Sequence, residues 1–192
     1  MKKLWEKLWQ KPGLKLLLGI PLGGFLFLAV GAAGWGAFNA SLHYSSTNEF
    51  CFGCHIGMDT VVEEYQESIH YKNVHGVVAT CADCHVPEPF FEKMEVKITS
   101  GIKDIYKKYW VKEINLENFE QEHRLRLAEH VWKDMQEQKS ATCQKCHDQS
   151  KMDLAAQPGR ASRAHDPVKW EENGESCVDC HYGIAHNRPT KF

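Results

Sequence analysis

The sequence predicts a mainly α-helical protein with extensive loops, in which one N-terminal membrane helix precedes a domain organised by bound cofactors. Three observations support this: an uncharged run near the N-terminus, helical spacing of apolar residues in later segments, and eight cysteines arranged as four matching pairs. No segment shows the alternation of apolar and polar residues that marks a strand. A chain of 192 residues has room for one domain with an appendage.

The uncharged run covers residues 16–38. As a helix with ~1.5 Å rise per residue it reaches ~35 Å, enough for the ~30 Å hydrocarbon core of a bilayer. A cleaved signal peptide is the alternative, but its apolar region is normally only ~7–15 residues long. We therefore interpret the run as a transmembrane anchor in the lipid bilayer. Gly19 and Gly23 form a small-xxx-small pair that could pack a second helix in a homodimer; the alternative is that glycine is simply frequent in membrane helices.

The distribution of charge sets the expected orientation. Residues 1–15 hold five lysines and one glutamate, whereas the whole chain has a net charge of −2. Because lysine-rich flanks stay in the cytoplasm, residues 1–15 are the expected cytoplasmic basic tail and residues 39–192 the periplasmic domain of a bacterial inner-membrane protein. The negative total excludes a nucleic-acid binder with a basic surface.

Three segments of the periplasmic part have apolar residues three or four positions apart, as helices do. They are Met58–Tyr71, Phe90–Trp110 and Leu116–Gln138. Their apolar content is modest for a body of this size. Something other than side chains must therefore complete the core.

The cysteines identify what completes it. All eight lie in C-x-x-C-H motifs: Cys51-Phe-Gly-Cys54-His55, Cys81-Ala-Asp-Cys84-His85, Cys143-Gln-Lys-Cys146-His147 and Cys177-Val-Asp-Cys180-His181. In such a motif both thiols form thioethers with a porphyrin, and the histidine binds its iron. Zinc ribbons do not require a histidine after each pair, and a redox dithiol would not recur four times. The sequence thus predicts four covalently bound haem c groups, arranged by spacing as two di-haem units.

Each low-spin iron needs a second strong ligand. The seven histidines outside the motifs are the candidates, at positions 43, 70, 75, 123, 130, 165 and 186. His123 and His130 are seven residues apart and share a helix face, which fits ligands, partners of haem propionates or packing residues. Met58 lies three residues after His55, where a thioether ligand and a core methionine are both reasonable.

The whole pattern resembles the NapC/NirT family of membrane-anchored tetrahaem cytochromes. The matching segments are EEYQESIHYKN, ATCADCHVPEPF, HRLRLAEHVW and CVDCHYGIAH. The resemblance implies a quinol dehydrogenase of the NapC/NrfH/CymA kind. Such a protein takes electrons from menaquinol or ubiquinol in the membrane quinol pool and passes them to a periplasmic reductase, such as nitrate or nitrite reductase, in anaerobic respiration.

The resemblance also selects iron ligands. It implies that three distal ligands come from the SIH, RAH and IAH positions, which are His70, His165 and His186. These would complete three haems together with His85, His147 and His181. In relatives a methionine binds the first haem and displaces the motif histidine. Here Met58 is three residues after His55, where relatives often have two, so His55 stays an alternative ligand.

The resemblance further implies a quinol site formed by Lys97 and Asp104. The two are seven residues apart and share a helix face. Asp104 would accept a proton, and Lys97 would stabilise a developing quinolate. Residue chemistry alone favours a solvated face, because other lysines decorate the same helix. Aromatic residues would hold the helix at the membrane interface: Phe90, Phe91, Tyr106, Tyr109 and Trp110.

Two rival functions remain at this point. One is an electron carrier without its own quinol site. The other is a small terminal reductase of nitrogen oxyanions, which would need an open haem in a pocket with acid–base side chains. Reduction of the haems by a quinol analogue, set against reduction of nitrite, distinguishes them.

Overall fold

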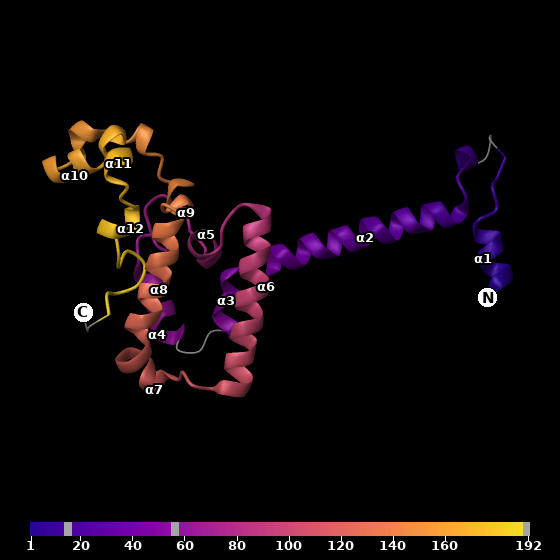
Figure 1. Ribbon diagram of the computed structural model, residues 1–192, viewed down its shortest axis with the longest axis horizontal. Helices are drawn as coiled ribbons and strands as arrows, with labels where there is room; N and C mark the ends of the chain where they lie inside the picture. The colour runs from indigo at the N-terminus through magenta and orange to yellow at the C-terminus, as the bar shows by residue number, and fades with distance from the viewer. Residues whose placement is uncertain (14–16, 55–57, 190–192) are drawn as a thin grey trace. The chain divides into compact units, whose positions relative to one another are not determined.

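The computed structural model describes residues 1–13, 17–54 and 58–189, without the side chains of Leu17, Cys54 and Met58. The chain divides into two compact units, Met1–Ser45 and Ser46–Phe192, each of which is described by itself. Every regular element in the described ranges is helical. The predicted class, mainly α with extensive loops, is confirmed (Figure 1).

The first unit contains α1 (Lys2–Leu8), the short 3-10 turn η1 (Leu17–Gly19) and α2 (Leu22–Tyr44). Among the described residues, α2 is the one helix long and apolar enough to cross a membrane. It begins and ends later in the chain than the predicted 16–38. Leu18 has a left-handed backbone (φ 51°), and Pro21 caps the helix start, so the helix begins only at Leu22.

The late start of α2 overturns the expected glycine pair. Gly19 lies in η1 with φ 76°, so it is not one helical turn before Gly23. Gly23 instead contacts the end of α1. A Cβ at position 23 would lie 3.1 Å from both the Leu8 carbonyl oxygen and Trp9 Cε2. This glycine serves close packing within the unit, and the structure gives no Gly19–Gly23 face for a second helix.

Two long helical segments dominate the second unit. The first is α6 (Phe90–Tyr106), which continues as a π-helical turn, η2 (Lys107–Val111). The second runs without interruption through α7 (Leu116–Asn118), η3 (Phe119–His123) and α8 (Arg124–Glu137). Both match the predicted segments closely. Figure 1 shows α6 and α8 as two columns connected through α7.

The predicted helix Met58–Tyr71 is shorter than expected. The observed helix, α4, covers Met58–Glu67. The Ser68 hydroxyl then donates to the Tyr65 carbonyl at 2.7 Å, and the chain turns. This side chain competes for a helix carbonyl, as serines commonly do at helix ends.

Each cysteine motif begins on a short helix, and Cys146 and His147 of the third motif follow just after the end of theirs. The four helices are α3 (Asn48–Cys54), α5 (Cys81–His85), α9 (Ala141–Gln144) and α12 (Cys177–Cys180). Between the third and fourth motifs lie η4 (Gln149–Lys151), η5 (Leu154–Ala156), α10 (Gly159–Ala164) and α11 (Pro167–Asn173).

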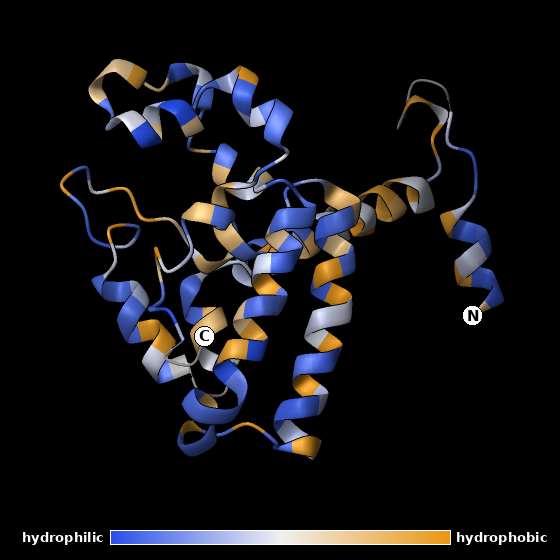
Figure 2. Cartoon of the chain, turned by 60° about the vertical axis from the view of Figure 1, so that its left-hand side comes forward, coloured by the Kyte–Doolittle hydropathy of each residue, from blue (hydrophilic) through white to orange (hydrophobic). Residues whose placement is uncertain are grey.

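The apolar core made by side chains is small. Tyr65, Phe119 and Val178 are the buried hydrophobic residues in the described part. Tyr65 meets Phe52 and Tyr71 edge-on, with ring centroids 6.4 and 5.0 Å apart. Elsewhere apolar and polar residues are interspersed along the long helices (Figure 2). The expectation that side chains alone do not fill this domain agrees with what is observed.

A buried ion pair connects three distant segments. The Arg124 guanidinium, only 7% exposed, donates to Glu64 of α4 and to the Asn187 carbonyl (2.8 Å) in the C-terminal segment. The Asn187 N–H donates in turn to Glu64 Oε2 at 2.8 Å. Burial alone would raise the pKa of Glu64, but the hydrogen bonds from Arg124 and Asn187 outweigh it and hold the pKa below its usual value.

We predict that Glu64→Gln destabilises the domain by ~1–3 kcal/mol at neutral pH, because it removes one of the two carboxylates that pair with the buried Arg124 guanidinium and leaves only Glu120. The folded-state pKa of Glu64 is lowered, so its contribution is present above the unfolded-state value of ~4.3 and is lost as pH falls through the folded-state pKa. Urea unfolding at several pH values measures both effects. The exposed neighbour, Glu63→Gln, is the control. A destabilisation that persists undiminished in acid would contradict this account.

Candidate functional site

Consecutive motifs adjoin through their cysteines. A hydrogen bond between the two thiols lowers the pKa of Cys51 to about 7 and raises that of Cys81. In the same way, a hydrogen bond with the Cys177 thiol lowers the pKa of Cys143 to about 6. Once a thiol is bound to haem as a thioether, its sulfur no longer titrates. What these pKa shifts show is that the two sulfur atoms of each pair lie close together. The first motif lies beside the second and the third beside the fourth, but Cys84 of the second motif also lies near Cys143 and Cys146 of the third, so the division into two di-haem units stays a prediction.

Capping boxes start the second and fourth motif helices. The Thr80 hydroxyl accepts from the Asp83 N–H (3.2 Å), and Asp83 Oδ2 accepts from the Thr80 N–H (2.8 Å). Ser176 and Asp179 form the same box. The sequence pattern S/T-C-x-D-C-H is the local signal from which both capping boxes could have been predicted. Each box fixes the single helical turn on which two cysteines and a histidine are displayed.

Polar contacts hold the motifs against one another. Lys145 of the third motif forms ion pairs with Asp83 of the second motif and with Glu88, both at 3.0 Å. The Ser140 hydroxyl, fully buried, accepts from the Val178 N–H of the fourth motif at 3.4 Å. The motifs therefore form a connected group even where apolar contacts are few.

The start of the first motif helix is fixed by Asn48. Its Nδ2 donates to the Tyr65 hydroxyl at 3.1 Å, and its Oδ1 accepts from the Cys81 N–H at 2.9 Å. The Tyr65 hydroxyl itself donates to the Ala79 carbonyl. One asparagine thus joins α3 to α4 and α5, a role for which there is no local signal in the sequence.

The predicted axial histidines face one another in three pairs. Ring centroids are 6.3 Å apart in His85–His186, 6.2 Å in His70–His147 and 5.9 Å in His165–His181. Every pair joins one motif histidine to one of the predicted distal histidines. An imidazole nitrogen binds a metal at ~2.0 Å and lies ~1.1 Å from its ring centroid, so two axial rings on one iron are ~6.2 Å apart. The side chains present therefore fit haem with two histidine ligands.

Hydrogen bonds orient two of the distal rings. His186 Nδ1 lies 3.1 Å from the Val61 carbonyl oxygen, and His165 Nδ1 lies 2.6 Å from Gln157 Oε1. Because these oxygens accept, each Nδ1 carries the proton and Nε2 is left to bind a metal. Burial lowers the pKa of His186, which favours the neutral ring that ligation requires.

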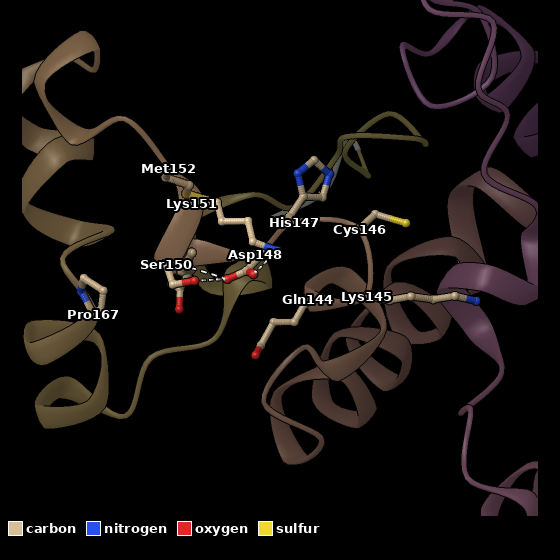
Figure 3. Close-up of a pocket in the computed structure, with 10 residues that line it drawn as sticks. Gln144, Lys145, Cys146, His147, Asp148, Ser150, Lys151, Met152 and Pro167 are labelled. Carbon is tan, nitrogen blue, oxygen red and sulfur yellow. Dashed lines mark hydrogen bonds and ion pairs between the residues drawn. The ribbon is translucent and has the colours of Figure 1, made fainter.

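The third motif borders an open pocket of about 670 Å³ (Figure 3). Cys146 and His147 form part of its wall, and Met152 and Pro167 contribute apolar surface. Asp148 is held there by Ser150 (2.6 Å) and Lys151 (3.0 Å). The pocket leaves open space beside Cys146 and His147 of the third motif.

The structure places Lys97 and Asp104 on the same, half-buried face of α6. Burial lowers the pKa of Lys97, and the nearby Cys51 acts in the opposite direction, which places this lysine beside the first motif. Lys108 Nζ donates to the Gly53 carbonyl of that motif at 2.8 Å. The charged face of this helix is therefore the one turned toward the first motif.

The opposite face of α6 and η2 is apolar and exposed. Phe91 and Trp110 are 84% and 70% exposed, at the two ends of this face. Ile98, Ile102, Ile105, Tyr106 and Tyr109 are exposed between them. This is the reverse of a helix that packs an apolar stripe on a core.

The ligands of the first haem stay a prediction. His55 and the side chains of Cys54 and Met58 lie outside the described residues. Among the histidines that the sequence left unassigned, His43, His75 and His130 are exposed, whereas His123 is buried. The positions of these four histidines in the sequence did not predict which of them would be buried.

Comparison with known proteins places the chain in a family. The sequence model of the family described as "NapC/NirT cytochrome c family, N-terminal region" matches residues 16–191. The chain is 40% identical to the cytochrome c-type protein NapC of Escherichia coli K12, over 98% of this chain and 90% of that protein. It is 38% identical to the denitrification system component NirT of Stutzerimonas stutzeri, over 94% and 91%.

Two further comparisons agree. A putative tetraheme cytochrome c-type protein of Allochromatium vinosum is 40% identical, over 92% of this chain and 90% of that protein. In fold, the chain is similar to a chain of the cytochrome c nitrite reductase NrfHA complex bound to the HQNO inhibitor. That likeness has a TM-score of 0.50 at 21% identity and covers 87% of this chain and 90% of that chain. The chain with its four C-x-x-C-H motifs therefore belongs to the NapC/NirT cytochrome c family.

Proposed function

We propose that this protein is a quinol dehydrogenase that takes electrons from the membrane quinol pool, menaquinol or ubiquinol, and delivers them to a periplasmic reductase. The observation that carries the proposal is the charged face of α6, which puts Lys97 beside the first motif on a chain with a membrane-spanning helix. A carrier without quinol chemistry has no need of a half-buried lysine at that place.

Four haem c groups, when bound, supply one-electron transfer. The residues of the chain contribute the rest. A quinol gives up two protons with its two electrons, so its oxidation needs a proton acceptor. Asp104 would take a proton from a quinol hydroxyl, and Lys97 would stabilise the negative charge left on the oxygen. Half-burial of both side chains strengthens these interactions relative to bulk water.

The proposed location follows from the anchor. The family and the single apolar helix support a single-pass protein of the bacterial inner membrane. The lysines among residues 1–15 favour a cytoplasmic N-terminus and a periplasmic second unit. There the exposed apolar face of α6 would lie in the lipid interface, where aromatic side chains are favourable and where quinol arrives.

The proposed electron acceptor is a periplasmic reductase of nitrate, nitrite or a similar substrate. The support is similarity to proteins named for the NapC and denitrification systems. Under the proposed ligation three of the four irons have two histidine ligands and no position left for a substrate, so a rival terminal reductase would have to use the first haem, beside which Lys97 lies.

The first prediction from the proposed function concerns how many haems are attached to the chain. Four motifs that use all eight cysteines should give a mature chain with four covalent haems and an intact N-terminal anchor. Intact-mass spectrometry of the detergent-solubilised protein measures both. Fewer than four haem additions, or loss of the first unit, would show that the motif assignment or the anchor assignment is wrong.

The second prediction concerns ligation. Replacing His70, His165 or His186 with Ala should each convert one low-spin haem to high-spin, because each ring faces one motif histidine. Magnetic circular dichroism and electron paramagnetic resonance of the oxidised proteins count the low-spin haems. His130→Ala, at an exposed ring, is the control and should change nothing. Low-spin spectra retained in all three variants would reject the pairing.

The third prediction concerns quinol. Asp104→Asn and Lys97→Gln should each slow oxidation of a quinol analogue, by ~10²–10⁴-fold where proton transfer is lost. Lys103→Gln, an exposed lysine of the same helix, is the matched control. Haem content and electron delivery from dithionite-reduced protein to the reductase should remain normal. Quinol oxidation at the wild-type rate in both variants would assign these residues to an ordinary solvated face.

A further inference from the structure

His123 is a buried side chain that neither the predicted ligation nor the quinol site uses. It ends the π-helical turn η3 and is only 7% exposed. Its Nε2 is buried without a hydrogen-bond partner among the described residues. A buried donor or acceptor left unsatisfied loses the hydrogen bond that it makes to water in the unfolded chain, which destabilises the fold. Such an atom in a native protein therefore needs an explanation.

The position of the imidazole proton follows from its other nitrogen. His123 Nδ1 lies 3.2 Å from Arg126 Nη2. A guanidinium only donates, so Nδ1 is the acceptor and the proton of the neutral ring sits on Nε2. The orphan atom is thus a buried N–H donor. The positive guanidinium polarises the ring, which strengthens that donor and favours a negatively charged acceptor.

The carboxylates closest in sequence do not meet this need. Glu120 is bound to Arg124, and Glu122 is exposed. Haem brings carboxylates of its own, because every haem carries two propionate groups. We propose that His123 Nε2–H donates a hydrogen bond to a haem propionate, with Arg126 acting through the ring as a positioning residue. The inference rests on the proposed haem loading, and is independent of quinol oxidation.

The proposal has a measurable consequence for the reduction potential of one haem. A hydrogen bond withdraws negative charge from the propionate, and a more negative propionate stabilises the ferric iron of its haem. Removing the donor should therefore lower the reduction potential of one haem and leave the other three unchanged. The same removal should alter the resonance Raman band of that propionate, which responds directly to its hydrogen bonding.

The test compares variants of the full-length protein whose four haems have first been verified by mass, so that failed loading is recognised separately. His123→Phe keeps a ring but removes the donor, and should lower one potential in a spectroscopic redox titration. His123→Gln, which places an amide N–H near the position of Nε2, should restore most of the wild-type value. His130→Phe, at an exposed ring of the adjoining helix α8, is the control and should move no potential.

Arg126→Gln provides a second probe if His123→Phe does not accumulate. It removes the polarising charge and keeps the ring, so the same single potential should fall by a smaller amount. The proposal is overturned if haem-loaded His123→Phe or Arg126→Gln shows four unchanged potentials and an unchanged propionate band. A uniform shift of all four potentials would also overturn it, because that would indicate a general change of the fold.

Discussion

The opposed imidazole pairs are the constraint on which the rest of the second unit depends. With three buried apolar side chains in its described part, this domain lacks the interior that usually holds helices together. The pairs join segments far apart in sequence. His85–His186 connects the second motif to the C-terminal segment, and His70–His147 connects the chain after α4 to the third motif. Under the proposed ligation, each haem crosslinks two elements and supplies the apolar volume between them.

The polar features of the domain support that arrangement. The Arg124–Glu64 pair fixes Asn187, next to His186, and the Val61 carbonyl sets the proton of that ring. Capping boxes start two motif helices at the residue before the first cysteine. The reversed face of α6 serves a different purpose. Lys97 lies beside the first motif, and the exposed apolar surface is the one that we propose contacts lipid.

The sequence predicted the features that have local signals. Helical periodicity located α6 and the segment from α7 to α8, and the motif spacing located the cysteines. The pairing of His85 with His186 could not be predicted from the sequence, because that contact depends on how the whole chain folds. The anchor helix was placed too early because hydropathy does not report the left-handed backbone of Leu18. The burial of His123 was equally invisible, since its spacing from His130 suggested two equivalent residues.

The most direct test of this account is an experimental structure of the haem-loaded protein, with the irons located by anomalous scattering. The account predicts four irons, three of which lie midway between the rings of His85 and His186, His70 and His147, and His165 and His181. An iron bound to one of these motif histidines but with any other residue on its opposite side would contradict the central claim that the three facing pairs organise the domain.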